Sequence, residues 1–137
     1  MKNIHTRTRR VHLVAGLILA GLFIASGIYL RFLFSKETGA IDIAHHMLYR
    51  ANHVYLLTAA LVNLLFIANL KPPVIRWQYL LQRLASAAVL VASILVVWAF
   101  VTEPQQMTLH RPITISSMLT LASGVLVLLL VNLKSNN

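Results

Sequence analysis

Residues 84–102 read LASAAVLVASILVVWAFVT, a run of 19 residues without a formal charge. A helix needs about 20 such residues to cross a hydrocarbon core of ~30 Å, whereas a strand of a membrane barrel needs only ~10. Lipid offers the backbone no hydrogen-bond partners, so a segment of this length must bond within itself as a helix. Three further uncharged runs have similar lengths, at 13–30, 51–70 and 113–133. The four runs together predict an all-α integral membrane protein.

The composition supports this class. Of 137 residues, 58% are hydrophobic and only 11% are charged, and the mean hydropathy is +0.76. A soluble domain carries roughly 25% charged residues, because a more apolar surface would expose large adhesive patches. The chain contains no cysteine, which excludes disulfides, iron–sulfur clusters and thiolate chemistry.

Short polar connections separate the runs. Lys71-Pro72-Pro73 follows the second run and Glu103-Pro104 follows the third, while Pro112 precedes the fourth at a position where a helix tolerates proline. Short connections make neighbouring helices antiparallel. We therefore expect one transmembrane domain over residues 1–137, an antiparallel up-down-up-down four-helix bundle. Its spans are expected near residues 10–34, 41–70, 76–102 and 112–133.

The basic residues predict orientation and argue against nucleic acid. One side of the predicted bundle holds no acid and eight basic residues, namely Lys2, Arg7, Arg9, Arg10, Lys71, Arg76, Arg83 and Lys134. Lysine and arginine beside span ends favour the cytoplasmic side and contact anionic lipids. We therefore expect both termini in the cytoplasm, with the chain in a bacterial cytoplasmic (inner) membrane. The basic residues form no stripe with interleaved aromatics, so the net charge of +9 does not indicate nucleic-acid binding. As an alternative, the N-terminal run could be a cleaved signal peptide, although it is long for that role.

The second predicted helix carries a polar face at its outer end. At ~100° per residue, Asp42, His46, Tyr49 and His53 share a narrow arc, and the opposite face is largely apolar. We expect His53 to point into the bundle, together with Asn52 or Tyr49 and with groups from the third or fourth helix. The alternative is a neutral histidine that only bonds a neighbouring helix. This face would form a polar His/Arg pocket at the outer membrane surface.

Two other polar residues of this helix need partners. Arg50 either extends into the lipid headgroups or pairs with a carboxylate, for which we favour Glu103 over Asp42. Asn63 lies deeper and is expected to bond a hydroxyl group of a neighbouring helix. The candidates are Ser86, Ser93, Thr120 and Ser123.

The first span suggests a cofactor. Arg10-Val11-His12, followed by an apolar run to Ser26-Gly27, resembles the opening helix of four-helix membrane b-type cytochromes. The resemblance covers about twenty residues and implies haem b, with His12 as a ligand. No second histidine is expected at the depth of His12, so a haem at the outer end would instead use His53 with His110. The candidate cofactor-binding residues are therefore His53, Arg50 and His12.

A transition-metal site at the outer end is a separate possibility. Asp42 and His46 are four residues apart, so both side chains could reach one ion from the same helix face. Glu103 and His110 could complete the coordination. Imidazole and carboxylate ligands suit zinc, copper or nickel.

The remaining hypotheses concern the whole chain. Neither a Ser/His/Asp arrangement nor a phosphate-binding glycine loop is present, so the sequence does not favour an enzyme. A small transporter or proton-relay component would use His53, Arg50 and Asn63. The interpretation that we favour is a non-catalytic accessory or structural subunit. Its partners would be the lipid bilayer, other membrane subunits or further copies of itself.

Overall fold

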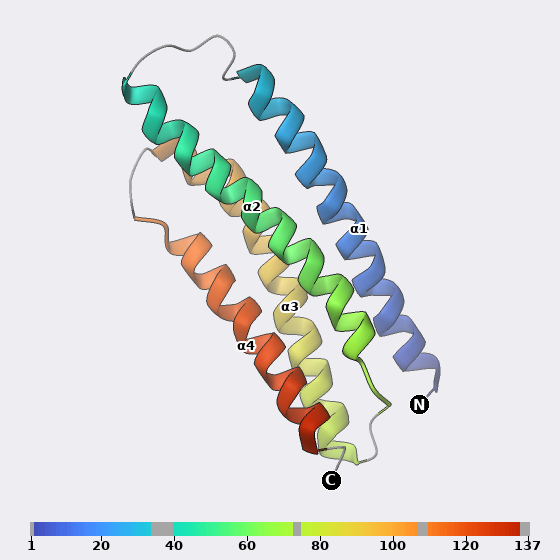
Figure 1. The fold of residues 1–137 in the computed structure, drawn as a ribbon. Coiled ribbons are helices and arrows are strands. Elements are labelled where there is room, and N and C mark those ends of the chain that lie inside the picture. Colours follow the sequence, from blue (N-terminus) through green and yellow to red (C-terminus); the bar gives the residue numbers. More distant parts are fainter. Residues whose placement is uncertain (1, 34–39, 73–74, 107–109, 135–137) are drawn as a thin grey trace.

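The computed structural model describes residues 2–33, 40–72, 75–106 and 110–134, without the side chains of residues 2–5, 33, 40–42, 44, 45 and 134. Four long helices lie side by side, and the N- and C-termini lie at the same end of the molecule (Figure 1). The helices are α1 (Lys2–Leu33), α2 (Ala40–Asn69), α3 (Arg76–Thr102) and α4 (Pro112–Lys134), with a short 3₁₀ helix, η1 (Pro104–Gln106), after α3. No strand occurs in the described part of the chain.

The prediction of four long apolar helices is confirmed. Each helix contains a segment that is long and apolar enough to cross a membrane: Thr6–Phe32, His46–Asn69, Arg76–Gln106 and Pro112–Leu133. The bounds of α2, α3 and α4 lie within one residue of the predicted spans. In contrast, α1 begins at Lys2 instead of near residue 10, because its basic first turns continue the helix beyond the apolar run.

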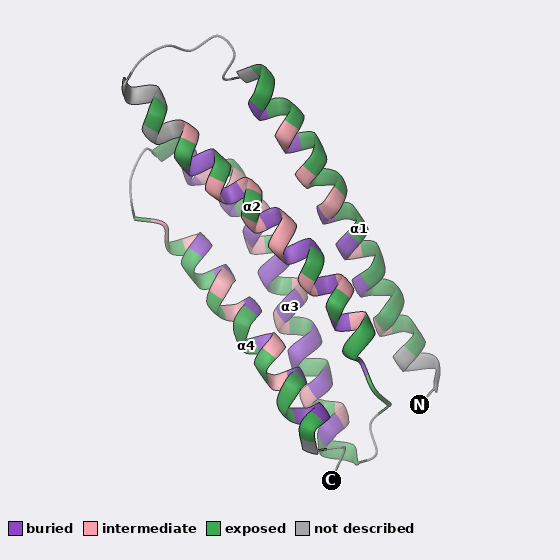
Figure 2. Ribbon diagram, in the orientation of Figure 1, coloured by how far each residue is buried: buried purple, intermediate pink, exposed green. Residues whose placement is uncertain are grey.

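The helices pack as two close pairs. α1 packs mainly against α2 and α4 packs mainly against α3, while α2 also contacts α3 and α4. Two small residues permit close approach. A Cβ on Gly16 would lie 3.0 Å from Leu64 Cδ2, and one on Gly124 would lie 2.9 Å from Val89 Cγ2. Buried residues therefore face the interior of the bundle, while the outward faces are exposed and apolar (Figure 2).

The end of α2 near the termini is tied to every other helix. The last carbonyl groups of a helix have no partner within it. Here Arg9 Nη2 of α1 donates to Ile67 O at 3.2 Å, and Asn132 Nδ2 of α4 donates to Asn69 O at 2.6 Å. Just beyond the helix, Gln82 Nε2 of α3 donates to Lys71 O at 2.9 Å. Side chains from α1, α3 and α4 thus converge on one helix end and fix its position.

Candidate functional site

The first polar site of the bundle is centred on His12, which is fully buried. His12 Nδ1 lies 2.8 Å from Asn63 Oδ1 of α2, and His12 Nε2 lies 2.8 Å from Ser86 Oγ of α3. The imidazole stacks on Phe66, with 4.2 Å between the ring centroids. We call His12, Asn63, Phe66, Ser86 and Ser93 the His12 site. It joins α1, α2 and α3 in the interior.

The hydrogen bonds of the His12 site assign its protons. Asn63 Nδ2 donates to Ala59 O and to Ser93 Oγ, both at 2.8 Å, so the amide oxygen must face His12. That oxygen only accepts, hence His12 Nδ1 carries the proton. Ser86 then donates to the lone pair on Nε2, and Ser93 donates to Val89 O. A neutral imidazole satisfies every one of these contacts.

Asn63 confirms one sequence prediction and extends it. Its expected hydroxyl partner is present, and among the four candidates it is Ser93. The bond to His12 was not predicted, since a sequence does not show how far the first helix is rotated toward the second. An indirect signal exists in the sequence, because Asn63 is a polar residue inside an apolar run and His12 is a polar residue directly before one.

The second polar site is centred on His53, toward the opposite end of α2. His53 Nδ1 lies 2.8 Å from Ser26 Oγ of α1, and its ring stacks on Phe23 with a centroid distance of 4.1 Å. A Cβ on Gly27 would lie 3.1 Å from His53 Cε1, so the glycine makes room for the ring. We call His53, Ser26, Phe23 and Gly27 the His53 site.

The protons of the His53 site differ in one respect from those of the His12 site. We assign the single hydrogen of Ser26 to its bond with Phe23 O, at 3.0 Å, and in this assignment His53 Nδ1 donates to Ser26 Oγ. Nε2 therefore keeps a lone pair, for which the described residues supply no hydrogen-bond donor. His53 is only partly buried. Its environment corrects the prediction of contacts with the third or fourth helix, because the close packing of α1 on α2 directs the ring toward α1.

Glu103 forms a third site, at the start of α4. Its carboxylate Oε1 accepts from the backbone N–H groups of Ile113 at 2.7 Å and Thr114 at 3.0 Å. Oε2 accepts from the Thr114 hydroxyl and lies 3.6 Å from Arg111 Nε. A carboxylate at this position satisfies free donors and interacts favourably with the helix dipole. We call this group the Glu103 cap.

The Glu103 cap also reaches α2. Asn52 Nδ2 donates to Ala99 O at 2.9 Å, and its Oδ1 lies 3.3 Å from Thr114 Oγ1. The guanidinium of Arg111 lies 5.7 Å from the centroid of the Tyr55 ring. The cap thus holds together α2, the end of α3 and the start of α4.

The prediction that Arg50 pairs with Glu103 was wrong. Glu103 pairs with Arg111, and the described residues contain no ion pair between Glu103 and Arg50. Arg111 lies close to Glu103 along the chain and directly precedes α4. Arg50 is exposed, as the alternative of headgroup contact predicts. The Asp42 side chain lies outside the described residues.

The predicted metal ligands are not gathered into a site in the described structure. Among the described side chains, no group of three or more histidines or carboxylates could hold an ion. Glu103 is engaged in the cap, His46 is partly buried and His110 is exposed. Asp42 lies outside the described side chains, so the full set of four stays a prediction.

The structure places His12 and His53 in two separate sites, and a haem held by His53 and His110 stays a prediction. Asn63, which bonds His12, is ten residues from His53 on α2, or about 15 Å along the helix. The described structure places both ring nitrogens of His12 in hydrogen bonds and packs Phe66 on its face. A buried apolar cluster separates the two polar sites; it comprises Leu19, Leu56, Ala59, Ala60 and Val96.

Comparison with known proteins finds no matching family model, no matching curated protein and no matching solved structure.

Proposed function

We propose that this chain is a non-catalytic accessory or structural subunit that associates with other subunits in a membrane. It would be inserted as an antiparallel up-down-up-down bundle with both termini cytoplasmic. The observation that carries the proposal is the closed hydrogen bonding of the His12 site. A histidine, an asparagine and two serines inside the bundle use their polar atoms on one another and on backbone carbonyls. Such groups hold helices together where lipid cannot solvate them.

The separation of the two histidine sites argues against a proton relay. A relay needs consecutive groups within hydrogen-bond reach, or water between them. The apolar cluster around Leu56, Ala59 and Val96 occupies the interior between the sites. This favours a structural role over the transporter or proton-relay alternative.

Helix α1 offers a surface for another membrane subunit. It lies at the edge of the bundle, and a Cβ on Gly21 would meet nothing within 4 Å. Gly21 and Ala25 are four residues apart and both exposed, a spacing that permits close helix–helix contact in membranes. Leu17 and Ile24 flank them and are exposed as well.

Photo-crosslinking in the native membrane tests this proposal. A photoreactive residue at Ile24 is expected to give an adduct with one discrete protein, whether another subunit or a second copy. The matched control carries the same residue at Leu126, an exposed position of α4. If Ile24 and Leu126 both give lipid adducts alone, the accessory-subunit proposal fails.

A transition metal bound at His53 is the second candidate, and the lone pair on Nε2 favours it. A metal-binding histidine commonly donates its other N–H to a neighbouring oxygen, as Nδ1 does here to Ser26. Elemental analysis of the purified protein tests this candidate. It predicts a stoichiometric metal that His53→Ala removes, and a metal-free protein contradicts it. An absorption spectrum of the same sample, with or without a Soret band, decides on haem b.

A further inference from the structure

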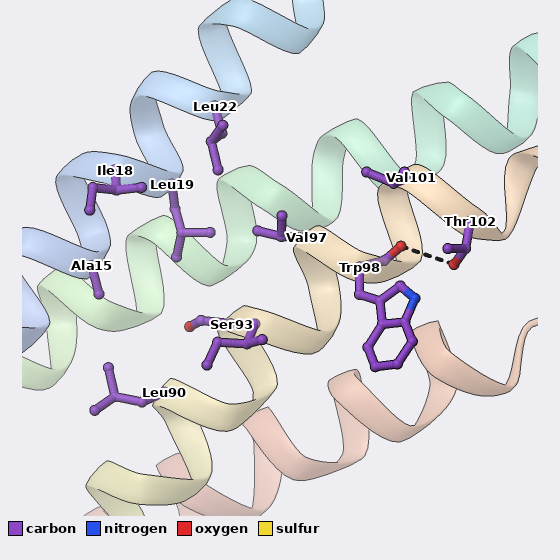
Figure 3. A pocket seen from close by; sticks show the side chains of 11 residues that line it. Ala15, Ile18, Leu19, Leu22, Leu90, Ser93, Val97, Trp98, Val101 and Thr102 are labelled. Carbon is purple, nitrogen blue, oxygen red and sulfur yellow. Dashed lines mark hydrogen bonds between the residues drawn. The ribbon is translucent and has the colours of Figure 1, made fainter.

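A long apolar groove lies between α1 and α3, beside the face of α1 that carries Gly21. It has a volume of about 820 Å³, and its lining includes Ile18, Leu22, Ile94, Val97 and Trp98. Figure 3 shows the side chains of the two helices facing this space. The groove exists because α1 packs on α2 and touches α3 only slightly.

The groove offers its occupant almost no hydrogen bonds. Its two hydroxyl-bearing residues already donate to the backbone of α3: Ser93 to Val89 O at 2.8 Å and Thr102 to Trp98 O at 3.0 Å. The dashed line in Figure 3 marks the second of these bonds. The chemistry of the lining therefore suits a hydrocarbon chain.

The faces of α1 and α3 that line the groove each carry an arginine nearer the N-terminal end of the helix. Arg83 precedes Leu90 by seven residues and Ile94 by eleven, so it lies within about 20° of both on α3. Arg7 precedes Ile18 by eleven residues, so it lies within about 20° of Ile18 on α1 and about 16 Å nearer the N-terminal end of that helix. Both arginines are exposed.

Arg7 and Arg83 lie at similar heights. The bond between His12 and Ser86 sets the register of α1 and α3. Arg7 is five residues before His12 and Arg83 is three before Ser86, which places them about 7 Å and about 5 Å below that bond. From Arg83 to Ile94 the helix rises about 16 Å, close to half of a ~30 Å hydrocarbon core.

The sequence has three acidic side chains, Glu37, Asp42 and Glu103, and none of them lies near Arg7 or Arg83 along the chain. Glu103 follows the last residue of α3, at the end of that helix opposite to Arg83. The guanidinium of Arg83 lies 5.7 Å from the centroid of the Tyr79 ring, which directs it along α3 beside the membrane surface. An anionic group at this position would find two guanidinium groups without competition from a carboxylate.

We propose that the groove between α1 and α3 is a binding site for an anionic phospholipid. One acyl chain lies against Ile18, Leu90 and Ile94, and the phosphate lies between Arg7 and Arg83. Basic residues between helices at a membrane surface select anionic headgroups in this way. The site goes beyond the proposed accessory role, which uses the neighbouring Gly21 face of α1.

Fluorescence quenching by brominated lipids tests the site. The reporter is Ile94→Trp in a chain whose two tryptophans are changed to phenylalanine, reconstituted in mixed vesicles of phosphatidylglycerol and phosphatidylcholine. Leu119→Trp on α4 is the control reporter. It is similarly exposed, 64% against 67% for Ile94, and the contact of Gly124 with Val89 places it at a matching height.

The expected result is a preference at Ile94 alone. Brominated phosphatidylglycerol should quench that reporter at a roughly fivefold lower mole fraction than brominated phosphatidylcholine, the equivalent of about 1 kcal/mol for a basic residue at the surface. The double variant Arg7→Gln/Arg83→Gln should abolish the preference, whereas Arg83→Lys should retain it. The variant Arg10→Gln/Lys71→Gln removes the same charge at the same end and should leave the preference intact.

Three outcomes overturn the proposal. Equal quenching of Ile94→Trp by both lipids would show that no anionic site exists. An equal preference at Leu119→Trp would show general surface attraction only. Protection of the Ile94 reporter from both lipids would show that a second copy of the chain covers the groove.

Discussion

The His12 site and the His53 site use the same residue types in opposite ways. In both, an imidazole of one helix stacks on a phenylalanine of a neighbouring helix and contacts a serine hydroxyl. His12 is completely buried and both of its nitrogens are bonded, while His53 is partly buried and has one bonded nitrogen. The difference teaches that a histidine in an apolar helix serves structure when its second ring nitrogen is bonded, and that this nitrogen can bind a ligand when it is not bonded.

The largest expected effect comes from His12→Ala. The change removes the packing on Phe66 and leaves Asn63 and Ser86 without a buried partner, which should cost about 3 kcal/mol of unfolding free energy. His53→Ala should cost about 1 kcal/mol, because its partner Ser26 keeps the bond to Phe23 O. Equilibrium unfolding in mixed detergent micelles measures both. An equal cost for the two variants would remove the distinction between the sites.

Glu103→Gln removes the charge of the cap at the end of the molecule that His53 occupies. The amide oxygen can still accept from the backbone N–H groups of Ile113 and Thr114, but the attraction to the helix dipole and to Arg111 is lost, together with the bond from the Thr114 hydroxyl. We expect a loss of about 2 kcal/mol. Arg50→Gln is the control, since Arg50 is exposed and not paired with Glu103. A similar loss in Arg50→Gln would restore the pairing that the sequence suggested.

Gly27→Ala examines the space that His53 occupies. The new Cβ would lie 3.1 Å from His53 Cε1, whereas the same change at Gly21 meets open space. Alanine favours a helix over glycine by up to about 1 kcal/mol, so Gly21→Ala should stabilise the protein while Gly27→Ala should not. Thermal unfolding of the two variants, side by side, measures the difference. Equal stabilisation would mean that the His53 ring is not packed against Gly27.

The smallest expected effect is that of Ser26→Ala. It removes one hydrogen bond from a partly exposed imidazole, at a cost of about 0.5 kcal/mol. Ser86→Ala should cost about 1 kcal/mol more, because the Nε2 of His12 would then be buried without a donor. The same unfolding assay compares the pair, and a reversed order would contradict the assignment of the two sites.

The residues show why some features could be predicted and others could not. The length of an uncharged run fixes the number and type of the helices, so the four apolar helices followed directly from the sequence. The position of Asn63 deep within its apolar run also predicted that its side chain bonds a hydroxyl group of a neighbouring helix. The rotation of each helix about its axis has no local signal, and it decides that His53 meets Ser26 and that Asn63 meets His12. Glu103 pairs with Arg111 instead of Arg50, because its carboxylate caps the first turn of α4 and Arg111 directly precedes that helix.

Nitrogen-15 NMR of the imidazole rings tests the contrast between the two sites most directly. Signals of His12 and His53 would be assigned by single substitutions in detergent-solubilised protein, and zinc ions would then be added. We expect both rings to carry the proton on Nδ1, with Nε2 of His53 shifting on zinc addition and Nε2 of His12 remaining unchanged. A zinc-induced shift at His12, or none at His53, would contradict the account.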